Sequence, residues 1–392
     1  MKKKILFIVI AIFMNITTNA QNEIDALRYS TQDLLGTARY SAMGGAFGSL
    51  GGEFSALSSN PAGIGMYQVS EFTFTPILNL NSTKSYYNTS HIKSYNQTMS
   101  IGNLGFVLSM SKNNSDWKRI NIGIGWNQLA NYDNNIKIEG RNNESSIVDQ
   151  IIGITNGTLT GVLTNGEGNA YSQMAWNTYL IDPLFNNNGL IDGEYISNFS
   201  ENTKQQSKSI QSSGSMNEFF FSIGSTYQEK LYIGATIGIP SIDYYEYSEY
   251  TEQEVSDTSN NLRQMRFSEE ISAYGEGYNL KIGAIYRISE KIKIGGALQT
   301  PTFFNIEEDY NTSITTFFKD STLNYSMGYP IPFNYNLITP LRASISASTV
   351  LNNIILAAEY ELIDYSTAKY FTSDFEIENE TIARIYQKTK KC

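Results

Sequence analysis

The sequence predicts an all-β protein, an antiparallel up-and-down β-barrel. Two observations predict this fold class. Apolar residues alternate with small polar residues in many segments, and short links between these segments alternate with long polar links. The composition agrees, since aromatic residues make up 13% of the chain and charged residues 17%, and the chain has 30 glycines and 27 tyrosines.

The first twenty residues have the pattern of a secretory signal peptide. A lysine run at positions 2–4 precedes the apolar segment ILFIVIAIFM, and the tripeptide TNA ends at Ala20 with a small residue suited to cleavage. The apolar segment is shorter than the roughly 20 residues that a membrane-spanning helix needs. We therefore expect residues 1–20 to be removed and the mature chain to begin at Gln21, without a lipid anchor because no cysteine follows the cleavage point.

Charge and cysteine content exclude several classes of protein. The formal charge of −10 becomes −13 once the three signal-peptide lysines are removed, so the phosphate backbone of a nucleic acid would be repelled. The single cysteine, Cys392, leaves no disulfide within the chain. After the signal peptide no run of about 18 apolar residues occurs, which excludes a helical membrane protein.

The alternation places an apolar face opposite a face of small polar residues. In RINIGIGWN, one face carries Ile120, Ile122, Ile124 and Trp126, whereas the other carries mainly Gly and Asn. The same pattern occurs in NLGFVLSM, LYIGATIGI, NLKIGAIYRI, KIKIGGALQT, LRASISAST and IILAAEYELI. A soluble sandwich would place Lys and Glu on its polar face. Gly, Ser, Asn and Thr favour a barrel lumen, and the apolar face then meets lipid, so we expect the cell outer membrane.

The links between these segments have two lengths. The short links are 111–118, 227–230, 288–291 and 350–353, and the long links lie around 81–98, 130–205, 251–263, 305–333 and 366–382. Outer-membrane barrels have short periplasmic turns and long external loops. We count nine strands and the beginning of a tenth in TIARIYQKTKKC, and we expect the tyrosine-rich strand end at 244–250 to form an aromatic girdle.

One region resembles a known family. The run GTARYSAMGGAFGSLGGEFSALSSNPAGIG, with its NPAG, resembles the N-terminal hatch of FadL/TodX-type transporters, outer-membrane proteins that admit long-chain fatty acids and other hydrophobic compounds. The segments WNTYLIDP, LQTPTFF, NLITPLRASISA and AAEYELIDYS resemble later parts of the family, so the similarity covers most of the mature chain. It implies passive uptake without a cofactor, with hydrophobic small molecules, outer-membrane lipid and the barrel-assembly machinery as partners.

The resemblance divides the chain into three parts: a signal peptide (1–20), an N-terminal hatch in the lumen (21–70) and the β-barrel (71–392). Family members have 14 strands, whereas this sequence reaches nine and part of a tenth. We therefore expect the sequence to be truncated at its C-terminus. Some relatives are outer-membrane components of a protein-secretion system, and the sequence does not separate that function from uptake.

Candidate site residues come from the hatch, from the long link and from charged positions on strands. The candidates for hatch gating are Gly44, Gly45, Phe47, Asn60, Pro61, Ala62 and Gly63, and the candidates for ligand binding are Arg39, Trp176, Tyr179, Arg342, Glu359 and Glu361. The last three have the parity that faces the lumen if Leu341 and Ile345 face lipid. Their alternative role is structural pairing with the hatch, for which Arg39 is a candidate partner.

The long link 130–205 holds two apolar segments. SSIVDQIIGI has helical spacing, and SQMAWNTYLIDPLF follows it. Exposed apolar helices are costly unless they pack on each other or on a ligand, so both a lid and a capture site remain open.

Catalysis and metal binding have little support in the sequence. His91 is the single histidine and lies in a polar stretch without a marked nucleophile. No Cys/His cluster and no EF-hand spacing occur in the chain. We therefore expect neither an enzyme nor a metal protein.

Overall fold

The computed structural model describes residues 23–112, 114–187, 189–199, 203–255, 261–328, 332–371 and 375–386. The expected signal peptide, residues 1–20, and Cys392 lie outside these ranges. The segment before the first strand is built from short helices. They are α2 (Glu23–Ser30), α3 (Ala38–Ala42), and the 3-10 helices η1 (Ser55–Ser58) and η2 (Pro61–Met66). We call residues 23–70 the hatch.

The rest of the described chain is mainly antiparallel strand. The strands of the main sheet are β1 (Glu71–Tyr87), β2 (Ser90–Ser111), β3 (Trp117–Asn131), β4 (Asn134–Asn142), β7 (Lys204–Tyr227), β8 (Leu231–Glu254), β9 (Leu262–Arg287), β10 (Ile292–Gln299), β11 (Phe303–Phe318), β12 (Thr322–Gly328), β13 (Phe333–Ile338), β14 (Arg342–Leu351), β15 (Ile354–Ile363) and β16 (Lys369–Tyr370).

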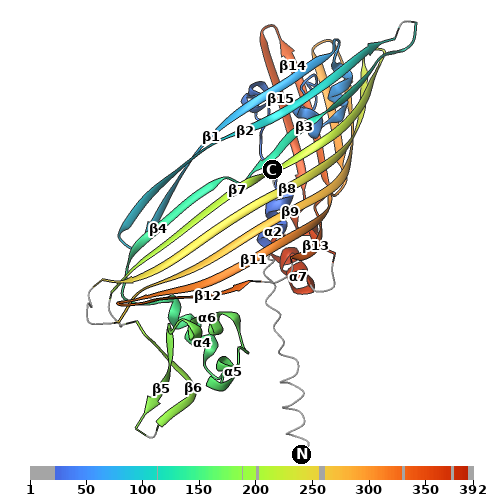
Figure 1. Cartoon of the computed structure of the whole chain (residues 1–392). Helices are drawn as coiled ribbons and strands as arrows, with labels where there is room; N and C mark the ends of the chain where they lie inside the picture. Colours follow the sequence, from blue (N-terminus) through green and yellow to red (C-terminus); the bar gives the residue numbers. More distant parts are fainter. Residues whose placement is uncertain are drawn as a thin grey trace, which may run out of the picture.

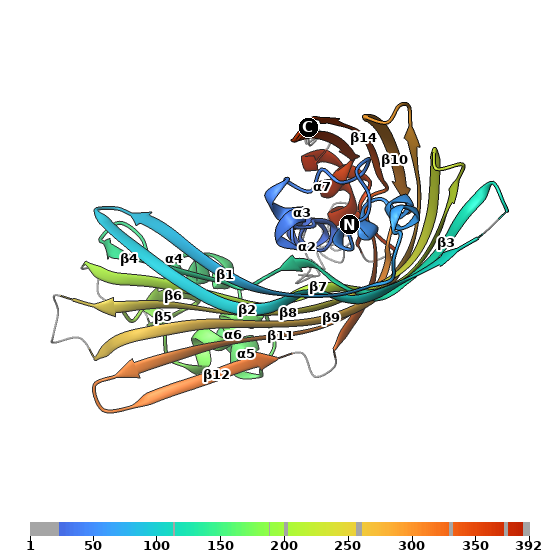
Figure 2. The same cartoon turned by 90° about the horizontal axis from the view of Figure 1, so that it is seen from above.

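The nine strands β1, β2, β3, β7, β8, β9, β10, β14 and β15 are hydrogen-bonded in that order, and β11, β12, β13, β16 and β4 attach beside this path. Among the described residues β1 and β15 do not pair with each other, so the 14-stranded sheet is open. It curls as a half-barrel around the hatch at one end and flattens at the other (Figures 1 and 2). The predicted all-β, antiparallel fold with a hatch on its concave side is confirmed.

The apolar alternation behaves as predicted. Residues such as Ile122, Ile237 and Ile282 lie exposed on the convex face, whereas Gly, Ser and Asn at neighbouring positions face the hatch. The same parity places Arg342 in the interior. Short turns at 227–231, 287–292 and 351–354 join the strands at the end that carries the hatch.

The predicted long loops are partly wrong. Residues 81–98 continue β1 and β2 up to a tight turn at Asn88, whose φ is 51°. Residues 305–328 continue β11 and form β12, and β8 and β9 extend into the segment 251–263. Residues 81–98 are largely polar on both faces, so their strand structure comes from the hydrogen-bonded ladder and cross-strand pairs. In β11, Ile306 and Ile314 are buried in apolar cores.

The link between β4 and β7 forms an accessory module. It contains α4 (Ile147–Thr155), α5 (Thr160–Thr164), α6 (Ala170–Asn177) and the hairpin of β5 (Ile181–Asn186) and β6 (Gly189–Ser197). The predicted helical spacing at 147–152 is confirmed by α4. Buried residues of the module, including Val148, Met174 and Leu180, share one apolar core with Met265 and Ile314 of the sheet.

The predicted tenth strand is wrong in its described part. Residues 381–386 belong to a helix, α7 (Glu376–Tyr386), which follows the short 3-10 helix η3 (Tyr365–Thr367). Helix α7 packs against α2 over the concave face, where Ile382 and Tyr29 join a core that includes Tyr335. Of its isoleucines, Ile382 is buried against this core, whereas Ile377 and Ile385 are exposed.

Candidate functional site: the interface between the hatch and the sheet

The NPAG segment forms a stiff corner at the centre of this interface. Asn60 is 1% exposed and caps η2, because its side-chain oxygen accepts a hydrogen bond from Ala62 N at 3.0 Å. Its amide nitrogen donates to Gly48 O at 2.6 Å. Pro61 occupies the first helical position, where a missing N–H costs nothing. The corner is therefore fixed by side-chain hydrogen bonds on both sides.

Glycines of the sheet allow this corner to lie against the strand backbone. A Cβ on Gly234 would lie 2.2 Å from Pro61 O, and a Cβ on Gly283 would lie 2.0 Å from Asn60 Oδ1. Both distances are far below van der Waals contact, so a side chain at either position would displace the corner. The glycines on the polar face of the strands thus serve to seat the hatch.

An apolar patch lies beside the corner. Phe54, Leu57 and Ile64 of the hatch form a buried cluster with Val107 and Phe220 of the sheet. Phe54 occupies the space above Gly105 and Gly125, where an added Cβ would lie 2.0 and 2.3 Å from its ring. Burial of a large apolar side chain stabilises by about 1.5–3 kcal/mol, so this patch contributes a substantial part of the hatch's attachment.

Polar side chains of the sheet bind the hatch backbone. Asn121 donates to Ile64 O at 2.6 Å and to Tyr67 O at 2.9 Å, and Thr226 donates to Gly65 O. These bonds go to carbonyl groups at the C-terminal end of η2, of which Ile64 O also accepts from Tyr67 N at 3.2 Å. The small polar residues that alternate with the apolar face therefore have a direct role, which is to hold η2.

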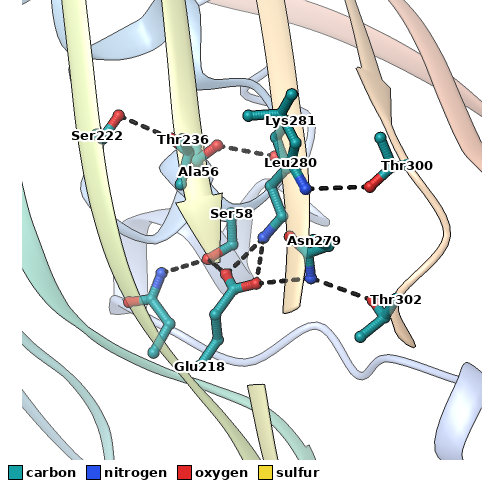
Figure 3. Close-up of polar contacts among 12 residues, drawn as sticks. Ala56, Ser58, Glu218, Ser222, Thr236, Asn279, Leu280, Lys281, Thr300 and Thr302 are labelled. Atoms are coloured by element: carbon teal, nitrogen blue, oxygen red, sulfur yellow. Dashed lines mark hydrogen bonds and ion pairs between the residues drawn. The ribbon is translucent and has the colours of Figure 1, made fainter. Parts of the chain in front are cut away.

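A buried ion pair lies beneath η1. Lys281 of β9 and Glu218 of β7 are both fully buried, and they form a salt bridge across the intervening strand β8 (Figure 3). Gly238 of β8 leaves the space for this contact, since a Cβ there would lie 2.4 Å from Glu218 Oε1. Ser58 of the hatch donates to Glu218 Oε2 at 2.9 Å, and Asn279 donates to Glu218 Oε1 at 3.4 Å (Figure 3).

Sequence reasoning missed this ion pair, although a signal was present. Glu218 and Lys281 both stand at inward-facing positions, and each is the single charged residue of its segment, NEFFFSIG and NLKIGAIY. The parity argument that selected Arg342 would have selected them too. Because Glu218 and Lys281 are 63 positions apart in the sequence, no local pattern indicates that they form a pair.

The predicted charged residues on β14 and β15 lie together beside a small cavity. This cavity of about 200 Å³ is lined by Tyr40, Gly44, Gly45, Arg342, Glu359 and Glu361, among others. Arg342 donates to Glu361 Oε1 at 3.1 Å and to Ser30 O, at the C-terminal end of α2, at 2.6 Å. Glu359 accepts from Gly48 N at 2.9 Å. Both side chains therefore bind the hatch directly.

Two further hatch candidates, Arg39 and Phe47, pack within the hatch, whereas Gly44 and Gly45 line the cavity. Arg39 bonds Glu53 and Gly52 O, so the pairing that we expected between Arg39 and the charged residues of the strands is wrong. The Phe47 ring packs on Tyr40. Gly44 and Gly45 have φ values of 62° and 79°, which make the turn after α3. Burial raises the pKa of Tyr40 to about 12.

Trp176 and Tyr179 lie in the accessory module, at the far end of the sheet from η2 (Figure 1). Trp176 packs edge-on against Tyr195, and Tyr179 is exposed. A second cavity, of about 520 Å³, lies beside the first turn of α4 and is lined by Tyr87, Ile147, Tyr250 and Phe267, among others. The two groups of predicted ligand-binding residues therefore occupy separate places.

Within the described ranges, no group of three or more His, Cys, Asp and Glu residues is arranged to hold a metal ion. None of the described helices is both long enough and apolar enough to cross a membrane.

Fold and site together define a class of protein: an antiparallel half-barrel whose concave face is occupied by an N-terminal hatch. No protein-family model and no curated protein sequence matches the chain. The Pseudomonas putida toluene transporter TodX is a structural neighbour, with 11% identity over 85% of this chain and 97% of that chain and a TM-score of 0.23. The Ralstonia pickettii toluene transporter TbuX has 8% identity over 86% and 98%, and a TM-score of 0.17.

Proposed function

We propose that this chain is an outer-membrane channel protein for passive uptake of hydrophobic small molecules, and that long-chain fatty acids are among its substrates. The observation that carries the proposal is the opposite character of the two faces of one curled sheet. The convex face is apolar near the hatch end. On the concave face, polar side chains of the sheet bind the hatch through hydrogen bonds. An apolar outer face suits lipid, and a segment that occupies the concave face suits a gate.

The convex apolar band is too wide for a soluble protein. Exposed residues of this band come from nine neighbouring strands: Phe72, Phe74, Phe106, Leu108, Ile122, Ile124, Phe221, Ile223, Ile233, Ile237, Leu280, Ile282, Ile294, Ile345 and Leu356. Soluble monomers rarely expose contiguous apolar patches above a few hundred Å², whereas lipid is the natural neighbour of such a surface.

The contacts of the hatch support a gate that can move. Glu359, Asn121 and Thr226 hold it through hydrogen bonds to its backbone, which exchange with water more readily than a covalent or metal crosslink breaks. Residues 60–62 lie against the strand backbone at Gly234 and Gly283. In this proposal, a ligand that passes between the hatch and the sheet has to displace them.

The cavity beside α4 is our candidate for first capture of the ligand. Its wall combines the apolar or aromatic side chains of Ile147, Tyr250 and Phe267 with polar groups such as Gln206. A volume of about 520 Å³ lies within the range of small-molecule sites. This cavity gives the accessory module a role besides mutual packing of α4 and α6.

Uptake measured in a deletion strain tests the proposal. The strain would be complemented with the wild-type chain or with a variant carrying Asn60→Ala and Pro61→Ala, and supplied with a radiolabelled long-chain fatty acid or with toluene. We expect wild-type uptake to exceed the deletion background and the variant to differ from wild type while remaining in the membrane. Uptake that never differs between deletion and wild type, together with altered secreted proteins, would instead support a secretion function.

A further inference from the structure

The chemistry of the pair formed by Glu218 and Lys281 differs from that of the other hatch contacts. Both side chains are fully buried, so neither charge is solvated by bulk water. A buried charge that loses its partner is strongly unfavourable, which keeps the two groups together. Their positions are fixed, because Asn279 bonds both Glu218 and Thr302 and because Gly238 leaves room for the contact.

One hydroxyl group of the hatch completes this arrangement. Ser58 donates to Glu218 Oε2 at 2.9 Å and accepts from Asn127 Nδ2 at 2.8 Å. A hydrogen bond to an ionised carboxylate is roughly twice as strong as one between neutral groups. Ser58 therefore joins η1 to two strands of the sheet, β7 and β3, through a bond that is stronger than those made by Asn121 or Thr226.

We infer that the Glu218–Lys281 pair holds the hatch against the sheet by binding Ser58, and we call this arrangement the latch. Breaking the hydrogen bond between Ser58 and Glu218 is the step that frees η1 and η2 from the sheet. Glu218 and Lys281 are positioning residues in this scheme: Lys281 orients Glu218, and Glu218 holds Ser58. The inference rests on the proposed function, because it names the contact that a passing ligand must break.

Hydrogen–deuterium exchange of the purified full chain in detergent tests the latch without reference to transport. Ser58→Ala removes the hydroxyl group that donates to Glu218 and leaves the ion pair between Glu218 and Lys281 intact. Ser222→Ala is the matched control, since Ser222 is a buried lumen-facing serine of the same strand as Glu218 whose hydroxyl bonds stay within the sheet, to Thr236 and to Ala235 O. Ser58→Thr keeps a hydroxyl group and tests rescue.

We expect exchange of peptides covering 55–67 to rise about tenfold or more in Ser58→Ala, the factor expected from a lost hydrogen bond to a charged group. Peptides of β8 and β9 should keep wild-type protection, and Ser58→Thr and Ser222→Ala should resemble wild type. Unchanged exchange at 55–67 in Ser58→Ala would overturn the latch. Loss of protection throughout the sheet in Ser58→Ala would also overturn it, because the serine would then support the whole fold.

The same variants separate the latch from the proposed function. If exchange at 55–67 rises in Ser58→Ala but uptake of every hydrophobic compound equals that of the deletion strain in all variants, wild type included, the latch stands and the uptake proposal fails. If wild type shows uptake and Ser58→Ala changes neither uptake nor exchange, the uptake proposal stands and the latch fails.

Discussion

Gly283 shows how a single residue determines where the hatch packs against the sheet. Its missing side chain admits Asn60 to the strand backbone, just as Gly234 admits Pro61. Lys281, two positions away on the same strand, adds a charge that binds Glu218. At the scale of single residues, the concave face of the sheet is complementary in shape and charge to the hatch. An added methyl group or a misplaced charge on this face would disturb the packing of the hatch.

Replacing Gly283 by Ala should destabilise the seated hatch. The new Cβ would overlap Asn60 Oδ1, and overpacking of this kind typically costs about 1–3 kcal/mol. Limited proteolysis should then cut residues 55–66 faster than in wild type. Gly296→Ala is the control, since its Cβ would meet Ser344 O at an acceptable 3.5 Å. Equal cleavage of both variants would contradict this role of Gly283.

Removing one partner of the buried pair should cost more than removing both. Lys281→Met leaves Glu218 buried without its cation, and such a loss costs about 3–5 kcal/mol. The double variant Lys281→Met with Glu218→Leu leaves no buried charge and should recover part of that loss. Denaturant unfolding of the three proteins in lipid vesicles measures the difference. A double variant less stable than Lys281→Met would contradict this expectation.

At the scale of elements, the sequence was informative where one face is apolar and uninformative where both faces are polar. The alternation in β3, β8 and β10 identified strands and their orientation. The extensions of β1 and β2 beyond residue 80 carry no such pattern, so they were interpreted as loops although their ladders continue.

The same limit applies to the candidate site. Inward parity correctly predicted a buried Arg342 and a partly buried Glu359, whereas the Glu361 side chain is 44% exposed. Parity alone does not show which hatch atoms these residues bind. The partner of Arg39 proved to be Glu53, 14 residues away within the hatch, because a short helical segment folds back on itself there. Contacts between distant segments depend on how the hatch folds, which no local pattern encodes.

The start of α4 also depends on a distant residue. Ser146 and Asp149 form a capping box, and Glu252 of β8 accepts hydrogen bonds from Ser146 Oγ and from Ile147 N at 2.9 Å. A carboxylate at a helix N-terminus also interacts favourably with the helix dipole. The accessory module is therefore attached to the sheet by charge as well as by its apolar core.

Glu252→Ala should loosen the accessory module and spare the hatch. Loss of the carboxylate leaves Ser146 and the first N–H groups of α4 without this partner, and such a loss costs about 1–3 kcal/mol. Peptides covering 147–177 should exchange deuterium faster, and those covering 55–67 should not change. Gln253→Ala, at the neighbouring exposed position, is the control. Faster exchange in both regions would contradict a local effect.

For the whole molecule, the position of the apolar band along the strands marks the portion that faces the membrane in the proposed function. On β9, exposed Tyr278, Leu280, Ile282 and Tyr286 lie toward the hatch end, whereas the exposed positions nearer residue 262 are mainly polar. The expected girdle at 244–250 is only partly formed, because alternation turns Tyr244 inward onto Arg28. Tyr245 and Tyr274 are the exposed aromatics at that level.

An arginine in the apolar band should impair membrane insertion. Ile282→Arg places a charge on the lipid-facing side, at a cost of about 2–4 kcal/mol near the bilayer midplane. Ser272→Arg changes an exposed position on the same face of β9, outside the band, and should be tolerated. The fraction of each variant recovered folded in the outer membrane checks this. Equal recovery would show that the band does not face lipid.

Strand β8 contacts both the hatch and the accessory module. It pairs with β7 over its full length without a register shift, from Leu231 to Glu254. Tyr232 near one end packs with Ala62 of the hatch, and Glu252 near the other end holds α4. At about 3.3 Å per residue, the two contacts lie roughly 66 Å apart on one uninterrupted ribbon. A displacement of the accessory module at Glu252 would therefore reach the contact with Ala62 through a single strand whose ladder with β7 is unbroken.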